Sequence, residues 1–376
     1  MNTNELLAQL RELLHGEPSM QRWLEVCALA IRIGPVGLSY ADHILHDHWP
    51  PPWNTVDMSR AQLNWRELKR VELRGAPLAH AHLRGARLEG VDLTRINLAH
   101  ANLAFAHLME ANLSHANLHR TDLSHANLSQ TTFAFANLSQ SNLRGARLTQ
   151  ANLHQSDLSG ATLHWSHLHH ADLSLTDLTH ADLRWTNLAQ TRGLAQATLK
   201  LARYNDQTRW PTDFDHRTSG AIGPEAHLPH QNLSGVDLTE VPAARATLTG
   251  ADLCQAMLIK TDLQHANLAQ ARLTEANLTW ANLHQANLSH ADLSRANLNA
   301  TNLYRANLSH ADLSHADLTR ADLSYADLSH ADLRGACLDQ AHLYRAILGR
   351  CLHDNNTRWP EQMTPPFHTT EPIPTS

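Results

Sequence analysis

Histidine is the side chain in this sequence that most invites acid–base or metal chemistry. The chain has 29 histidines among its 376 residues. If residues 20 apart were neighbours in space, His290, His310 and His330 would form one ladder of imidazoles. Such a ladder could titrate near neutral pH or bind a metal ion. No Cys or Glu joins it, whereas zinc prefers a closed tetrahedral set of ligands. The sequence therefore favours solvent-facing histidines, and it predicts no metal site and no cofactor.

Aspartate and tryptophan recur with the same spacing of 20. Asp292, Asp312 and Asp332 fall on one line, and Trp165 and Trp185 fall on another. A line of carboxylates could imitate the phosphates of DNA, and a pair of tryptophans could contact a macromolecular partner. We treat these five residues as the candidate partner surface. The alternatives are that the aspartates support turns and that the tryptophans only pack against each other at a corner.

No pattern typical of an enzyme accompanies these lines. The sequence contains no glycine-rich phosphate loop, no nucleophile elbow and no Ser–His–Asp grouping. The net charge of −6 is neither basic enough for a general nucleic-acid binder nor acidic enough for a uniform DNA mimic. We expect a non-catalytic protein without a small-molecule substrate.

Compartment and membrane association follow from the cysteines and the apolar runs. The four cysteines form no C-x-x-C pair, which favours reduced thiols and a cytoplasmic location. The N-terminus does not resemble a signal peptide, and no apolar run is long enough for a membrane span.

The elements that position these side chains follow from a repeat of five residues. Every fifth residue from Leu63 to Leu188 is Leu, apart from Phe133, and the pattern resumes from Leu228 to Leu348 with one Ala. Two positions before most of them stands a small residue, usually Ala, and the residue between is most often Asn or Asp. A period of five fits neither a helix nor a plain strand, but it fits a short extended segment followed by a corner.

The interior is predicted by alternation within each extended segment. Successive side chains of an extended chain point to opposite sides, so the small residue and Leu point inward and Asn or Asp points outward. The expected structural core includes Leu103, Leu113, Leu123, Phe133, Leu298, Leu308 and Leu318.

The unit Ala-(Asn/Asp)-Leu-x-x resembles the pentapeptide-repeat family over residues 61–199 and 226–352. The resemblance implies an all-β solenoid, a right-handed quadrilateral β-helix with four units per coil. It also implies a scaffold for protein–protein interaction. Some members of the family instead resemble B-DNA, occupy the DNA site of DNA gyrase and protect it from antibiotics, which is the alternative. A secreted effector is a second alternative.

The remaining segments suggest caps and a linker. Leucines 6, 7, 10, 13 and 14 form a helical stripe, and further helices are expected at about 19–33 and 40–46. These helices could cap the first array or join two copies as a homodimer. The predicted parts are a helical cap domain at 1–58, a first β-helix with its plug at 59–211, a linker at 212–225, a second β-helix with its plug at 226–360, and a disordered tail at 361–376.

Both arrays end on the same four residues, Thr-Arg-Trp-Pro. We expect Trp210 and Trp359 to cover the last coils, and Pro211 and Pro360 to block further strand pairing. Near the end of the first array, Gly193 shifts the repeat by one residue.

The two arrays differ in charge. Residues 59–192 contain 13 Lys and Arg against 10 Asp and Glu, whereas residues 226–352 contain 9 against 12. The first coils are basic and could contact an acidic partner or nucleic acid, although exposed charges commonly serve only solvation. The basic residues there are Arg60, Arg66, Lys69, Arg70, Arg74, Arg84 and Arg87.

Overall fold

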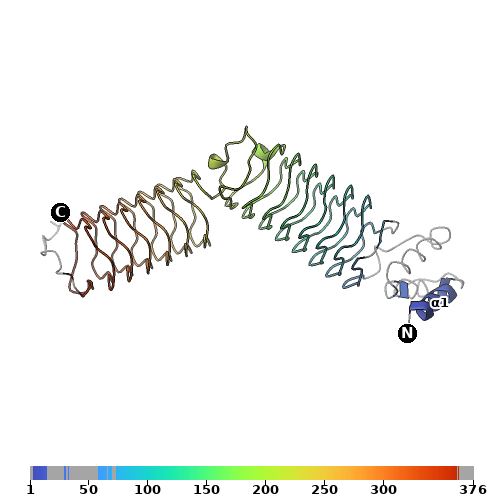
Figure 1. The fold of residues 1–376 in the computed structure, drawn as a ribbon, viewed down its shortest axis with the longest axis horizontal. Helices are drawn as coiled ribbons and strands as arrows, with labels where there is room; N and C mark the ends of the chain where they lie inside the picture. The colour runs from blue at the N-terminus through green and yellow to red at the C-terminus, as the bar shows by residue number, and fades with distance from the viewer. Residues whose placement is uncertain are drawn as a thin grey trace, which may run out of the picture. The chain divides into compact units, whose positions relative to one another are not determined.

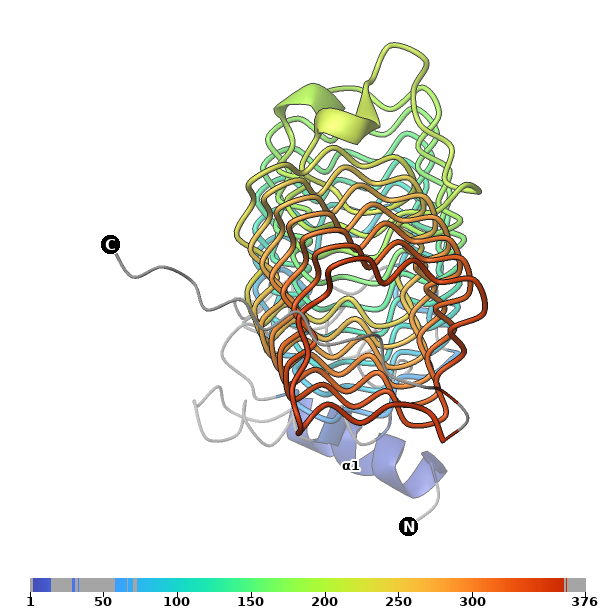
Figure 2. The same ribbon diagram turned by 90° about the vertical axis from the view of Figure 1, so that its left-hand side faces the viewer.

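The chain forms two compact units, Met1–Asp215 and His216–Ser376, each containing one array. The computed structural model describes residues 3–14, 29–30, 33, 58–65, 67–69, 73–361 and 363. Figure 1 shows each array as a stack of coils that carries almost no regular helix. Figure 2, turned by 90°, shows successive coils as closed loops that are offset from one another.

Among the described residues, three helical elements have defined bounds. Helix α1 (Thr3–Leu14) buries Leu10 and places Glu5 in its first turn, where a negative charge favours the helix dipole. The 3₁₀ helix η1 (Leu194–Gln196) lies at an insertion near the end of the first array, and η2 (His216–Thr218) lies at the start of the second unit.

Several predictions about the termini fall largely outside the described residues. Of the second predicted helix only residues 29, 30 and 33 are described, and they are helical. The third predicted helix, the Trp-Pro-Pro-Pro-Trp segment, Arg66, Arg70 and the tail beyond residue 361, apart from Met363, lie outside them. Dimerisation through the N-terminal helices stays a prediction.

Each array is a right-handed quadrilateral β-helix with 20 residues per coil. The outward residue of each unit forms a parallel bridge with the residue 20 positions later, as Asn102 does with Asp122. The N–H of Leu103 donates to the carbonyl of Asp122 in the next coil, at 2.7 Å. The N–H of Asn102 donates to the carbonyl of Ala81 in the previous coil, at 2.9 Å. Backbone polar groups on the four sides are therefore satisfied by the coils above and below.

The corners are β-turns with a left-handed residue at the fifth position of the unit. The N–H of Ala106 donates to the carbonyl of Leu103 at 3.0 Å, and Phe105 between them has a φ of +61°. A positive φ at the third residue of such a turn is the type II geometry. It usually needs Gly, yet here His, Gln, Arg and aromatic residues adopt it throughout both arrays.

The left-handed conformation of the fifth residue was not predicted, although the residue types at this position indicate it. From residue 60 to 190 and from 225 to 350, no fifth position holds Val, Ile, Thr or Pro. β-Branched side chains are strongly disfavoured at positive φ, and proline cannot reach it. The exclusion of these residues marks where the left-handed turn lies.

The interior is filled by the central and first residues of each unit. Leu103, Leu113, Leu123, Phe133, Leu298, Leu308 and Leu318 are all 0% exposed. Threonines that replace Ala inside are satisfied by the backbone, since the hydroxyl of Thr121 donates to the carbonyl of Leu98 at 2.8 Å. The interior of each array is thus occupied by its own side chains.

The coils lengthen at the end of the first array. Along most of the array the two residues of a bridge are 20 positions apart. Near its end, Asp177 instead pairs with Thr198, 21 positions later, and Asn187 pairs with Arg209, 22 positions later. Gly193 makes the first insertion with a φ of +73°, and a Cβ there would lie 2.6 Å from the Ser174 backbone. Only glycine fits this position without a shift of the neighbouring coil.

The second array begins within the segment predicted as a linker. Ala221, Ile222 and Gly223 are buried, and Glu225 has the positive φ of a fifth residue. Residues 221–225 therefore have the conformation of a repeat unit although Gly replaces the central Leu.

The left-handed corners predict how stability responds to β-branching. Gln155 is exposed with a φ of +53°. We expect Gln155→Val to lower the free energy of unfolding by about 1–2 kcal/mol, because Val is strained there. Gln155→Asn should be neutral or stabilising, since Asn tolerates this conformation. Thermal and denaturant unfolding of the full chain would measure both.

Thr132→Val is the matched control. Thr132 lies on an extended side of the coil, where a β-branched residue fits. An equal loss of stability in Thr132→Val and Gln155→Val would contradict the role of the left-handed corner.

Candidate partner-binding surfaces

Side chains that could bind a partner or a metal ion lie on the outer surface of the arrays, because Leu and Ala fill the interior. In the part of the chain that the structure describes, no three His, Cys, Asp or Glu side chains gather closely enough to hold a metal ion. Among the same residues, no helix has the length and apolar character needed to cross a membrane. The surface features are columns of side chains that repeat from coil to coil.

Trp165 and Trp185 are brought together at one corner of the first array. Their ring centroids lie 5.5 Å apart with an angle of 35° between the planes. The edge of His164 faces Trp185 at 5.5 Å, and the guanidinium of Arg144 lies 4.2 Å from the centre of Trp165. Both tryptophans keep about 40% of their surface exposed, 43% and 39%. A partly exposed aromatic cluster with a cation against one of its rings is therefore available for binding.

An ion-paired network lies beside this cluster. Asp182 accepts two-point hydrogen bonds from Arg184, at 2.9 and 2.6 Å, and His164 Nε2 lies 2.7 Å from the same carboxylate. Burial acts to raise the pKa of Asp182, but the hydrogen bonds and charge of Arg184 and the charge of His164 outweigh it and hold this pKa below its ordinary value. The network holds His164 against Trp185.

The three aspartates of the second array also form a column, with Asp292 bridged to Asp312 and Asp312 to Asp332. Each is partly committed to its own corner. Asp292 accepts hydrogen bonds from the N–H and the hydroxyl of Ser294, and Asp332 is paired with Arg334. Despite the opposing effect of burial, these bonds keep the pKa of Asp292 and Asp332 below the ordinary value. The column is anionic, but its carboxylates are already hydrogen bonded or ion-paired to residues of the same array.

The histidine ladder forms as the spacing predicts. His290 stacks on His310 at 4.8 Å, and His310 stacks on His330 at 4.6 Å, with planes within 8°. All three imidazoles are exposed at a corner. The arrangement is a flat strip of imidazoles beside the aspartate column.

A second aromatic corner, on the second array, escaped the sequence reasoning. His284 stacks on Tyr304 at 5.4 Å, and Tyr304, Tyr325 and Tyr344 follow at 5.5 Å each. Arg305 and Arg345 lie between 5.3 and 5.8 Å from the tyrosine rings. We call this set the tyrosine corner. Tyr325 stands at the fifth position of its unit, whereas His284, Tyr304 and Tyr344 stand at the fourth, so their spacing is not a constant 20.

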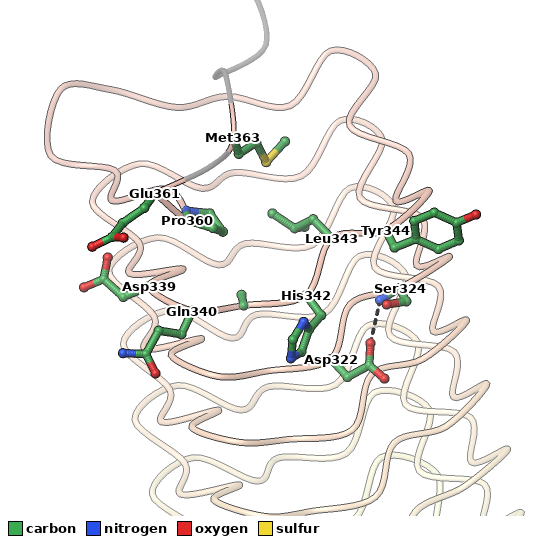
Figure 3. A pocket seen from close by; sticks show the side chains of 11 residues that line it. Asp322, Ser324, Asp339, Gln340, His342, Leu343, Tyr344, Pro360, Glu361 and Met363 are labelled. Atoms are coloured by element: carbon green, nitrogen blue, oxygen red, sulfur yellow. Dashed lines mark hydrogen bonds between the residues drawn. The ribbon is translucent and has the colours of Figure 1, made fainter.

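A hollow of about 1070 Å³ lies near the end of the second array. Figure 3 shows Leu343, Pro360 and Met363 around its middle, with Asp339 and Glu361 on one side. Tyr344 lies on its opposite side, so the tyrosine corner runs up to this hollow.

The residues predicted as plugs occupy the last unit of each array. Thr357 is buried and its hydroxyl donates to the carbonyl of Leu333 at 2.9 Å, while Arg358 bridges Cys337. Trp359 therefore takes the central position of the unit and lies half-buried with its edge to His353. In the first array Trp210 is likewise half-buried, between Tyr204 and Phe214. Pro211 is buried and Pro360 is half-buried.

Comparison with known proteins identifies the repeat. A family model described as pentapeptide repeats in eight copies matches in overlapping segments, at residues 57–95, 92–130, 126–164, 156–192, 232–275, 261–299, 276–314, 301–340 and 311–350. No curated protein matches the chain.

Solved structures with the same repeat are similar to this chain. HetL, a pentapeptide repeat protein involved in heterocyst differentiation regulation in the cyanobacterium Nostoc sp. strain PCC 7120, is 26% identical and covers 78% of this chain and 89% of its own, with a TM-score of 0.22. QnrB1, a plasmid-mediated fluoroquinolone resistance protein, is 17% identical over 57% of this chain and 92% of its own, with a TM-score of 0.29. Rfr23 from the cyanobacterium Cyanothece 51142 is 27% identical over 35% and 84%, with a TM-score of 0.17. With scores this low, none of these structures assigns a function to the chain.

The Asp182 network predicts a pH-dependent stability. A carboxyl group whose pKa is lowered by folding stabilises the fold above its unfolded pKa, and this stabilisation is lost as the pH falls through the folded pKa. We expect Asp182→Asn to cost about 1.5–3 kcal/mol at pH 7, because Asn carries no charge and has only one oxygen to accept the Arg184 hydrogen bonds. The difference from the wild type should shrink as the pH falls below about 4.

Melting temperatures of both proteins between neutral and acidic pH would measure this difference. Asn142 occupies the equivalent position two coils earlier, so the substituted side chain fits the turn. A stability difference that stays constant across this range would contradict the assignment.

Proposed function

Because the chain belongs to the pentapeptide-repeat family, we propose that it is a non-catalytic scaffold that binds another protein through the outer surface of its arrays. We place this activity in the cytoplasm, following the reduced cysteines expected from the sequence. The interior offers no room for a substrate, since Leu and Ala fill it from coil to coil. A partner would therefore bind to the columns of side chains on the outer surface.

The tyrosine corner is the observation that carries the proposal. Tyr, Trp and Arg are the residues that most often dominate the free energy of protein–protein binding. Here three tyrosines and two arginines lie against one another along a single corner. Tyr344 is 62% exposed and borders the hollow lined by Leu343 and Met363. Together they offer an aromatic ridge beside a depression that Leu343, Pro360 and Met363 line together with the carboxylates of Asp339 and Glu361.

The backbone strengthens this proposal. Every side of the coil is hydrogen bonded to its neighbours, so the corner is held in place before a partner arrives. A preorganised surface loses less conformational entropy on binding than a flexible one. Tyrosine also brings a large contact area with few rotatable bonds.

Affinity capture with a matched control tests the proposal. We expect full-length protein to retain a defined partner from native lysate, and a Tyr304→Ser, Tyr325→Ser, Tyr344→Ser variant to lose it. Trp280→Ser is the control, because Trp280 is 60% exposed on another corner of the same array. Mass spectrometry would identify the retained proteins. Retention unchanged by the tyrosine substitutions would move the interface elsewhere.

Protection of DNA gyrase is the second candidate function, and the aspartate column favours it. A DNA mimic must present dense negative charge where the enzyme expects phosphates. Asp292, Asp312 and Asp332 do follow one another along one side. Their bonds to Ser294 and Arg334, however, leave the column partly neutralised.

We therefore expect no competition with DNA for purified gyrase at about micromolar protein and physiological salt, where contacts to phosphate positions are strongly screened. A supercoiling assay with and without a quinolone would measure this. Inhibition, or rescue from the drug, that disappears when the three aspartates are replaced by Asn would place gyrase protection first.

A further inference from the structure

One corner of the first array carries a single run of aromatic rings and glycines. We call it the aromatic corner. Parallel bridges from Gln62 through Asp182 stack seven successive coils on this side, so the fifth residues that follow them form a column. The members of the column are Trp65, Gly85, Phe105, His125, Gly145, Trp165 and Trp185. No aliphatic or acidic residue interrupts it.

The two glycines are the places where a neighbouring ring needs room. A Cβ on Gly85 would lie 2.0 Å from the Trp65 ring, and one on Gly145 would lie 2.6 Å from the His125 ring. The Trp65 and His125 rings thus occupy the space that a side chain at these positions would take. Phe105 stacks on His125 at 5.1 Å, and Trp165 contacts Trp185 at 5.5 Å, so two pairs of neighbouring rings follow one another along the column.

Arginines complete the column beside each glycine. The guanidinium of Arg84 lies 4.5 Å from the centre of Phe105 and 6.0 Å from that of Trp65. Arg144 lies 4.2 Å from the centre of Trp165. Among the described residues, neither Arg84 nor Arg144 forms an ion pair with a carboxylate. Both charges stay available to an anion.

The side that follows the corner is also cationic. Its outward residues are Glu67, Arg87, His107, Asn127, Arg147, His167 and Asn187. Glu67, the one acid among them, lies 3.4 Å from Arg87, which is also 3.6 Å from Glu89, so the charge of Arg87 is engaged by these carboxylates. Arg147 is exposed and adds a third available guanidinium next to Arg144.

We propose that the aromatic corner binds single-stranded nucleic acid. Nucleobases can stack on exposed aromatic rings, and phosphates can pair with guanidinium groups beside them. Trp65 is 64% exposed, and Trp165 and Trp185 retain open ring surface. Seven coils give a length of about 29 Å, at ~4.8 Å per coil, enough for several nucleotides.

A single strand fits this surface better than a duplex or an acidic protein. A duplex hides its base faces, so it could use the arginines but not the rings. An acidic protein could use both, yet it gives no reason for every member of the column to be aromatic or a glycine that leaves room for a ring. The net charge of the chain is −6, so an attraction for phosphates depends on local positive charge such as that of Arg84, Arg144 and Arg147.

Fluorescence anisotropy with a labelled oligothymidylate of about 12 nucleotides tests the proposal on the full chain. We expect saturable binding at low salt. Trp165→Ala with Trp185→Ala should raise the Kd by at least about tenfold, because each stacked base is lost. Arg84→Gln with Arg144→Gln should reduce the slope of log K against log salt by about 1.4. Trp280→Ala, on the second array, should leave the Kd unchanged.

The same measurements contain the results that would overturn the proposal. They are an absence of saturable binding at low salt, an equal affinity for the matched duplex, and a Kd that ignores the tryptophan substitutions. Tighter binding of a poly-glutamate peptide than of the oligonucleotide would assign the corner to an acidic protein instead. Circular dichroism of each variant would confirm that the coils remain folded.

Discussion

The left-handed conformation of every fifth residue is the constraint on which the structure depends. It turns the chain after each three-residue extended segment, and four such turns bring it back over itself after 20 residues. The turn is costly for any residue other than Gly, by roughly 1–2 kcal/mol. That cost is offset by a closed interior of Leu and Ala and by hydrogen bonds from each coil to both neighbours. Without left-handed residues at the corners, the coils would not close, and neither the apolar interior nor the columns of outward side chains would form.

The columns follow directly from this closure, and they are what the protein can offer a partner. Because most coils have 20 residues, a side chain at one corner is followed by its equivalent about 4.8 Å further on. Rings at that distance stack, as His290, His310 and His330 do. Wider rings tilt, as Trp165 and Trp185 do. Substitutions at the same outward position in successive coils therefore change a whole strip of the surface without changing the fold.

The sequence predicts the inward and outward sides well, because alternation in an extended segment is a local property. Leu298 and Asp292 could be placed in this way without any three-dimensional information. The number of units per coil is not local, and it came from resemblance to a known family. The tyrosine corner was missed because Tyr304 and Tyr325 come from different positions of their units and are 21 residues apart. The Asp182–Arg184 network was also missed, since nothing in the spacing says which rotamer an exposed Arg will adopt.

The outward aspartates illustrate why a repeat of this kind does not become a DNA mimic merely by being acidic. Asp292 and its equivalents accept hydrogen bonds from the N–H two residues later, as do the Asn residues at the same position elsewhere. One carboxylate oxygen is thus committed to holding the corner. A charge that also pairs with a neighbouring Arg, as at Asp332, has little left to offer an incoming protein. Dense negative charge would need many aspartates without arginines beside them, whereas in the second array Arg272 lies in the aspartate column itself and Arg295, Arg320 and Arg334 lie at corners.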